Sequence, residues 1–214
     1  MKHILFDLDG TLTESAPGII NSAKYALHQM GYSIPDDAIL EKFVGPPLLE
    51  SFSKHCGMDE ASAKEALRLY RVYFREKGMF ENSLYENIPE LLEKLCARGF
   101  TVSLATSKPE EFAVQILKHF GIYKYFSGIC GASMDGSFHE KADVIGKLIS
   151  DMGYAPEDCV MVGDRKHDVL GASAWGIMCI GVVYGYGGRE ELEKAGADLI
   201  AESTTELEKI LLND

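Results

Sequence analysis

The chain has 214 residues, of which 46% are hydrophobic and 25% are charged, as in an ordinary soluble globular protein. Its formal net charge of −12 argues against a nucleic-acid partner, which would require a basic surface. Its five cysteines form no C-x-x-C pair, so we expect reduced thiols. No apolar run approaches the roughly 18 residues of a membrane span and no leader precedes the first predicted strand, so a cytoplasmic protein without a membrane partner is expected.

Five short segments have the apolar character of β-strands. The predicted strands are 3–7, 100–105, 126–130, 159–162 and 178–183. The first and fourth are apolar without interruption, which favours strands buried on both faces. Helical patterns cover 89–98, 109–119, 140–152 and 167–175, and a capping box at 203–206 predicts a last short helix. This alternation predicts an α/β fold with a Rossmann-like, mostly parallel sheet.

The interval between the first two strands is much longer than a crossover requires. About ninety residues separate them, where a dozen or more would suffice. Helical patterns fill this interval and no convincing strand interrupts them. We therefore predict an all-helical cap over residues 15–80, inserted into an α/β core formed by 1–14 and 81–214. The alternative is that these helices flank the sheet, although one crossover has room for about one helix.

The first predicted strand ends in two aspartates. Asp7 and Asp9 stand two positions apart, which places both side chains on the same face of a strand, and Gly10 follows. Two like charges a few ångströms apart are unfavourable unless a cation or a shared proton compensates them. The pair therefore favours a metal site or an acid–base pair over a solvated, aspartate-rich turn.

Later segments place polar residues at the same edge of the predicted sheet. Ligands of open α/β sheets bind beyond the carboxyl ends of the strands. Taken singly, these residues are common as helix caps or solvated charges, but together they indicate one site. They are Thr106, Ser107 and Lys108 after the second strand, Lys141 before the fourth, and Asp164 and Asp168 after it.

These motifs together resemble the haloacid dehalogenase-like phosphohydrolases. The pattern Asp-x-Asp-Gly-Thr, then a Thr or Ser, then a Lys, then Gly-Asp-x-x-x-Asp runs across the whole chain in that order. The helical insertion follows the first motif, as in members with an α-helical cap of the first type. The stretches Thr-Ser-Lys-Pro and Gly-Asp-Arg-Lys-His-Asp are similar to the phosphoglycolate phosphatase group, and the second also resembles a 5′-nucleotidase-like branch.

The resemblance implies a phosphatase that uses Mg²⁺. It makes Asp7 the nucleophile that forms an aspartyl-phosphate, and Asp9 the general acid and base. It places Mg²⁺ on Asp7, on the main-chain carbonyl of Asp9 and on Asp164. Asp168 would hold water molecules bound to the metal, or Lys141. The implied substrate is a small phosphorylated metabolite, with phosphoglycolate and nucleoside 5′-monophosphates as candidates, and a monomer is expected.

The resemblance also implies which residues contact the substrate. Thr106 and the amides after it would bind phosphate oxygens, and Lys141 would neutralise charge on the phosphoryl group and on Asp7. Many relatives have proline after this lysine where this chain has Ala142, so Lys147 is the alternative. The complete set of expected substrate contacts is Gly10, Gly45, Thr106, Ser107, Lys108 and Lys141.

Two other functions are compatible with the motifs. A β-type sugar phosphomutase would use the same aspartate pair, and a receiver-like switch would be phosphorylated on Asp7 without turnover. Asp9 and the large cap argue against the switch. Dehalogenating members lack an aspartate at the position of Asp9, so Asp9 favours phosphoryl chemistry.

Two weaker signals concern the rim of the site. Gly185-Tyr186-Gly187-Gly188 resembles a phosphate cradle, but it lacks a full G-x-G-x-x-G pattern, which favours a flexible rim loop. Lys42, Lys108 and Arg165 are cations that could hold a second anionic group of the substrate.

Overall fold

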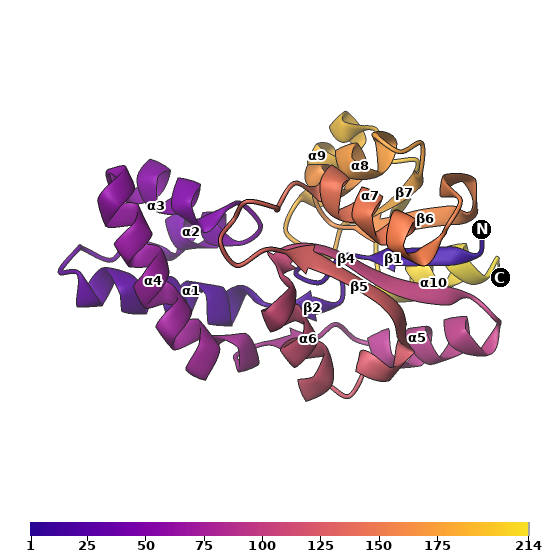
Figure 1. Ribbon diagram of the computed structural model, residues 1–214, viewed down its shortest axis with the longest axis horizontal. Coiled ribbons are helices and arrows are strands. Elements are labelled where there is room, and N and C mark those ends of the chain that lie inside the picture. The colour runs from indigo at the N-terminus through magenta and orange to yellow at the C-terminus, as the bar shows by residue number, and fades with distance from the viewer. Residues whose placement is uncertain (214) are drawn as a thin grey trace. The chain divides into compact units, whose positions relative to one another are not determined.

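The computed structural model describes residues 1–213, and the chain divides into two compact units (Figure 1). One unit comprises Met1–Thr13 and the chain from Leu84 onward, and the other comprises Glu14–Ser83. The first unit is the α/β part of the chain and the second is its helical part. Among residues 1–213, no helix is both long and apolar enough to cross a membrane.

The α/β unit contains a six-stranded sheet in the order β5-β4-β1-β6-β7-β8, and every neighbouring pair is parallel. Helices cover both faces of this sheet (Figure 1). The predicted α/β class is therefore confirmed. The strands are β1 (His3–Phe6), β4 (Thr101–Pro109), β5 (Phe126–Ala132), β6 (Cys159–Gly163), β7 (Met178–Val182) and β8 (Leu199–Ala201). The helices are α5 (Ile88–Ala97), α6 (Glu110–His119), α7 (Lys141–Met152), α8 (Lys166–Ser173), α9 (Gly188–Ala195) and α10 (Thr204–Leu212).

Strand β1 lies at the centre of the sheet, between β4 and β6. Its residues Ile4, Leu5 and Phe6 are completely buried, as a strand covered by helices on both faces requires. After β1 the chain builds β4 and β5 on one side before it returns to β6 on the other. The carboxyl end of β1 is therefore the point where the strand order reverses, which is the usual ligand site of such sheets.

Strand β4 is longer than the sequence predicted. We expected it to end at residue 105, but it continues to Pro109, and its pairing with β5 is irregular between Thr106 and Pro109. The end of this strand therefore contains Thr106, Ser107 and Lys108, which do not lie in a loop after it. Helix α6 accordingly begins at Glu110, with Pro109 as its N-cap residue.

The helical unit is built mainly on two long helices, α1 and α4, and the short turn that follows α4 approaches the backbone of α1 closely. A Cβ atom on Gly18 of α1 would lie 1.8 Å from the carbonyl oxygen of Gly78, so only glycine fits there. Phe43 and Phe52 pack edge to face at 5.1 Å in its interior. Its elements are α1 (Ala16–Gln29), α2 (Asp37–Leu40), η1 (Glu41–Phe43), α3 (Leu48–Cys56), α4 (Glu60–Glu76) and η2 (Gly78–Phe80).

Two short strands lie where the chain passes from one unit to the other and back. β2 (Thr13–Glu14) and β3 (Ser83–Leu84) form a two-stranded sheet. The sequence predicted no strand in this interval, and that prediction was wrong. Strands of two residues are too short to produce a periodic pattern.

Candidate active site

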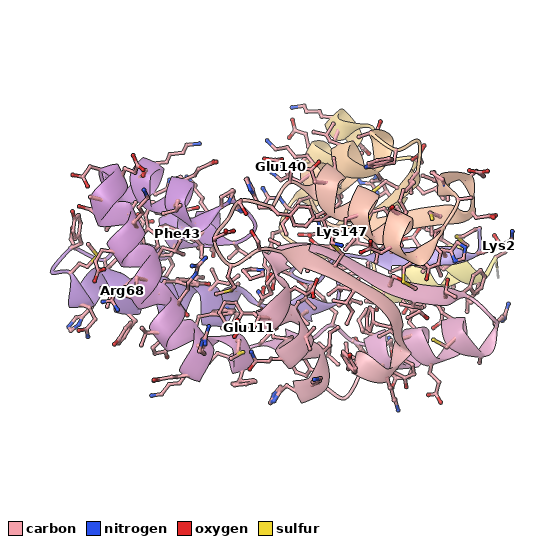
Figure 2. All side chains as sticks on the ribbon, in the orientation of Figure 1. Lys2, Phe43, Arg68, Glu111, Glu140 and Lys147 are labelled. Carbon is pink, nitrogen blue, oxygen red and sulfur yellow. The ribbon has the colours of Figure 1, made fainter. Side chains whose placement is uncertain are left out.

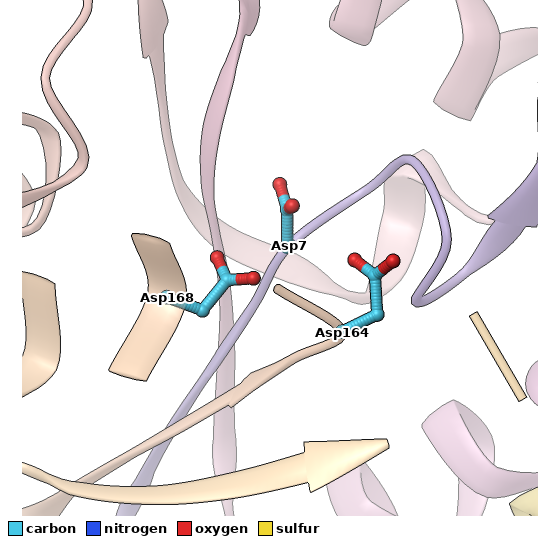
Figure 3. Close-up of side chains that lie close together, drawn as sticks. All are labelled: Asp7, Asp164 and Asp168. Carbon is cyan, nitrogen blue, oxygen red and sulfur yellow. The ribbon is translucent and has the colours of Figure 1, made fainter. Parts of the chain in front are cut away.

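The carboxyl ends of β1 and β6 bring three aspartates together (Figure 3). Asp7 directly follows β1, and its N–H donates a hydrogen bond of 2.9 Å to the carbonyl of Val162 in β6. Asp164 directly follows β6, and Asp168 lies in the first turn of α8. One carboxylate oxygen from each of the three lies within 4.8 Å of the others. We call these three residues the acidic triad.

The acidic triad is buried, which makes its charge costly. Asp164 and Asp168 are completely buried, and the Asp7 side chain is 13% exposed. Burial raises the pKa of Asp7 to about 6, with Lys141 opposing this shift and Asp168 adding to it. Burial also raises the pKa of Asp164, and the charges of Asp168 and Asp7 add to the effect. Burial therefore makes the charged forms of these carboxyl groups costly unless a cation lies beside them.

Lys141, at the start of α7, is the ammonium group that faces the triad. Its Nζ lies 2.9 Å from Asp7 Oδ1 and 2.7 Å from Asp168 Oδ1, and it donates to the carbonyl of Ala105 at 3.0 Å. Burial disfavours its charge, but the two aspartates more than offset this and raise the pKa of Lys141. Lys147, the alternative from the sequence, also lies on α7 (Figure 2). It pairs with Asp151 at 2.6 Å, and both side chains are more than half exposed.

The triad has the character of a cation site. Three carboxylates face one ammonium group, so the charge of Lys141 alone does not balance theirs. Buried carboxylate oxygens are normally satisfied by hydrogen bonds or by a metal ion. Oxygen donors of this kind suit a hard divalent cation such as Mg²⁺. The residues present therefore fit such an ion.

Asp9 forms a second charged pair beside the triad. Both of its carboxylate oxygens accept from Lys108 Nζ, at 2.9 and 2.6 Å. The side chains of Asp9 and Lys108 are only 17% and 6% exposed. We expected Lys108 among the substrate contacts, and in the structure its ammonium group lies against Asp9. Neighbouring Thr106 is buried, with its Oγ1 accepting from the Lys108 N–H at 3.2 Å, whereas Ser107 is exposed.

Two glycines in the expected substrate set occupy different parts of the chain. Gly10 follows Asp9 with φ +81°, and its N–H donates to the carbonyl of Thr13 at 2.8 Å. That amide is therefore already used within the turn after β1. Gly45, with φ +101°, lies in the turn before α3 of the helical unit. Arg165, which the sequence offered as a cation for the substrate, pairs with Glu191 at 2.8 Å.

Two contacts of Asp164 were missed by sequence reasoning. Its Oδ2 accepts from the N–H of Tyr186 at 2.8 Å, and its Oδ1 accepts from Thr11 Oγ1 at 3.5 Å. Thr11 belongs to the first motif, but no role was expected for it. Tyr186 belongs to the glycine-rich stretch after β7, which resembles a phosphate cradle and which we interpreted as a flexible rim loop.

With this geometry described, comparison with known proteins identifies the family. Residues 4–182 match the model of the haloacid dehalogenase-like hydrolases, so the chain belongs to this family. A solved structure described as a predicted phosphatase from Clostridium acetobutylicum superposes with a TM-score of 0.94 and 46% identity, covering 100% of this chain and 99% of the other.

Three relatives have names that bear on the reaction, and two of the three names describe phosphatases. A 5′-nucleotidase from Pseudomonas aeruginosa is 50% identical over 190 residues, or 89% of this chain and 86% of the relative. The tyrosine-protein kinase PtkA from Mycobacterium tuberculosis is 42% identical over 202 residues, or 94% and 69%. A phosphoglycolate phosphatase from Vibrio parahaemolyticus is 30% identical over 222 residues, or 99% and 96%. The protein is thus a phosphatase, as its sequence motifs predicted, and its class acts on small phosphorylated substrates.

Proposed function

We propose that this protein is a Mg²⁺-dependent phosphatase that hydrolyses small phosphomonoesters through an aspartyl-phosphate on Asp7. The observation that carries the proposal is the buried acidic triad with Lys141 against Asp7 and Asp168. A fold does not sustain three buried carboxylates around one ammonium group for stability, because desolvation outweighs the attraction between such charges. We therefore infer that these carboxylates serve catalysis.

Asp7 is the proposed nucleophile. Its carboxylate forms a bond to phosphorus while the ester P–O bond breaks, and the leaving alkoxide takes a proton from Asp9. In the second step Asp9 accepts a proton from water, the water oxygen bonds to phosphorus, and the acyl-phosphate bond breaks to restore Asp7. Lys108 holds both oxygens of Asp9, which fixes the orientation of this carboxyl group.

Asp7, Asp164 and the main-chain carbonyl of Asp9 are the groups that would hold Mg²⁺. When bound, this ion neutralises charge on the phosphoryl oxygens and on the attacking carboxylate. Asp168 accepts from the Arg165 N–H at 3.0 Å and contacts Lys141, so it orients that lysine beside Asp7. Lys141 and Thr106 are the proposed contacts to the phosphoryl oxygens.

Nucleoside 5′-monophosphates are the leading substrate class in this proposal, and phosphoglycolate is the second. The ranking follows the relatives, since the one named 5′-nucleotidase is 50% identical and the one named phosphoglycolate phosphatase is 30% identical. We also propose that the helical unit acts as the cap, that Gly45 remains a substrate contact within it, and that the protein works as a cytoplasmic monomer.

The first experiment is a phosphate-release panel with and without Mg²⁺. It contains purine and pyrimidine 5′-monophosphates, phosphoglycolate, sugar phosphates and an aryl phosphate. We expect metal-dependent release with a preference for one class. Release that is unaffected by removal of divalent ions would refute the metal requirement. Interconversion of sugar phosphates without phosphate release would establish the mutase instead.

A second experiment tests the covalent intermediate. Acid quenching during turnover, followed by borohydride reduction, should convert the phosphorylated residue to homoserine, which peptide mass spectrometry would locate at position 7. A stable phosphorylated Asp7 that never turns over would support the receiver-like switch. A modification at a different residue during turnover would exclude Asp7 as the nucleophile.

A further inference from the structure

The segment between β7 and α9 packs against the site but contains none of the proposed reacting groups. This segment, residues 183–187, is called here the β7–α9 loop. We propose that it positions Asp164 for metal binding. The inference rests on the proposed function, because the loop has this task only if Asp164 holds the metal.

A backbone hydrogen bond joins the loop to Asp164. The N–H of Tyr186 donates to Asp164 Oδ2 at 2.8 Å, within the usual range for a bond from an amide to a carboxylate. Oδ1 accepts the longer contact of 3.5 Å from Thr11 Oγ1. The loop therefore fixes the rotation of this carboxylate through one oxygen and leaves the other weakly engaged. Groups that orient a metal ligand in this way commonly influence metal affinity.

The glycines of the loop are required for space and not for backbone conformation. A Cβ atom on Gly185 would lie 2.4 Å from Asp164 Cβ, 2.6 Å from its Oδ2 and 2.3 Å from the carbonyl oxygen of Gly10. A Cβ atom on Gly187 would lie 2.2 Å from the carbonyl oxygen of Asp164. Neither glycine has a positive φ, so an alanine would fit the backbone but not the space beside Asp164.

At Gly188, by contrast, glycine is required for the backbone conformation and not for space. Gly188 has φ +72°, and a Cβ atom there would meet nothing within 4 Å. An alanine at this position strains the backbone without touching Asp164. Gly188 therefore provides a matched control that separates general strain in the loop from displacement of Asp164.

Both ends of the loop are tied to segments that carry the site. The Tyr184 hydroxyl donates to the carbonyl of Thr11 at 3.1 Å, and its ring packs edge to face on Tyr85 at 4.8 Å. Beyond the loop, Glu191 of α9 accepts from Arg165 Nε at 2.8 Å and from the Lys166 N–H at 2.9 Å. These bonds hold the loop against the turn after β1 and against the residues after Asp164.

This arrangement also gives the glycine-rich motif a role that differs from a phosphate cradle. A cradle presents free N–H groups to an anion. Here the Tyr186 N–H is already used by Asp164, and Gly185 and Gly187 contact Asp164 and the turn after β1. The motif therefore acts on the carboxylate of the protein and not on the phosphate of the substrate.

Calorimetric titration of Mg²⁺ into the metal-free, full-length protein without substrate tests the inference. The Kd for Mg²⁺ should rise by about 10- to 100-fold in Gly185→Ala, and near-UV circular dichroism should confirm that this variant is folded. Gly188→Ala should bind Mg²⁺ with the Kd of the parent. An unchanged Kd in folded Gly185→Ala, or an equal rise in Gly188→Ala, would overturn the inference.

Two more variants keep the test decisive. If Gly185→Ala does not fold, Tyr184→Phe removes only the bond to the Thr11 carbonyl and should raise the Kd by a smaller factor, and an unchanged Kd there would overturn the inference. Asp164→Asn separates this inference from the proposed function. Parent-like Mg²⁺ binding by Asp164→Asn would overturn both, whereas weak binding by Asp164→Asn with parent-like loop variants would overturn the loop's role alone.

Discussion

Two lysine–carboxylate pairs of similar length occupy very different places in this molecule. Lys141 and Asp7 are 2.9 Å apart at the end of the central strand, and Lys64 and Glu60 are 2.6 Å apart on α4 of the helical unit. The first pair is 4% and 13% exposed, and the second is 63% and 83% exposed. A buried pair must overcome a large desolvation cost, whereas an exposed pair has little to overcome and contributes little.

The same contrast extends to the two units as a whole. Besides Lys141, the α/β unit buries Asp164 and Asp168, and these charges converge at one point. The interior of the helical unit is built instead from side chains such as Phe52 and Phe74, and its ion pairs lie on the surface. The buried charges thus lie at the candidate active site of the α/β unit, whereas the interior of the helical unit is packed with apolar side chains.

Asp7→Asn should have the largest effect on turnover. Asparagine keeps the size of the side chain but removes the nucleophilic carboxylate, so turnover should fall by more than about 10⁴-fold. The metal-free protein should melt no lower than the parent, because repulsion within the acidic triad decreases. Asp151→Asn, on the exposed face of α7, is the control and should retain parental turnover. Substantial turnover in Asp7→Asn would show that another group attacks phosphorus.

Lys141→Met should lose both activity and stability. Its removal leaves Asp7 and Asp168 buried without an opposing charge, which should destabilise the metal-free protein by about 3–5 kcal/mol. Turnover should fall by about 10²- to 10³-fold as charge stabilisation is lost. Thermal melts and steady-state kinetics measure the two effects.

Lys147→Met is the matched control for that experiment, since both lysines lie on α7. Lys147 pairs with exposed Asp151, so its loss should change neither quantity appreciably. Saturating Mg²⁺ should return part of the stability lost in Lys141→Met, because binding to the folded state alone adds to its stability. Equal behaviour of the two variants would show that burial does not distinguish the pairs.

The sequence was sufficient to predict the α/β class and the convergence of the triad. Parallel strands meet at one edge of a sheet, so Asp7 after the first strand and Asp164 after the fourth had to lie close together once the topology was assumed. Lys141 joined them because a helix that precedes a strand begins at that same edge. Chain order and strand direction carry this information, and both can be read from patterns of apolar residues.

The details that the sequence did not provide depend on local geometry. Whether Lys108 faces Asp9 or a substrate depends on how far β4 extends, and its irregular last residues give no periodic signal. The hydrogen bond from Tyr186 to Asp164 is donated by a main-chain N–H, which almost every residue type has, so the sequence gives no sign of it. β8 was missed because it has three residues and Leu199 is 43% exposed, so it lacks both length and alternation.

Lys108→Met tests whether the second charged pair serves proton transfer. Without Lys108, Asp9 loses the group that holds both of its oxygens, and protonation of the leaving group becomes inefficient. Turnover of a nucleoside 5′-monophosphate should fall by about 10- to 100-fold, whereas an aryl phosphate with a good leaving group should lose less than about threefold. Equal losses for both substrates would instead place Lys108 on the phosphoryl group.

Glu60→Gln should have the smallest effect, and it tests the exposed half of the comparison. The substitution removes the i,i+4 pair with Lys64 on α4 but leaves the helix and its buried face unchanged. We expect a change in melting temperature of at most about 1 °C and unchanged turnover, measured at low and high salt. A shift of several degrees would mean that surface charge contributes to the stability of the helical unit as strongly as packing does. Burial would then no longer distinguish charged groups with a large effect on stability or turnover from charged groups that only contact water.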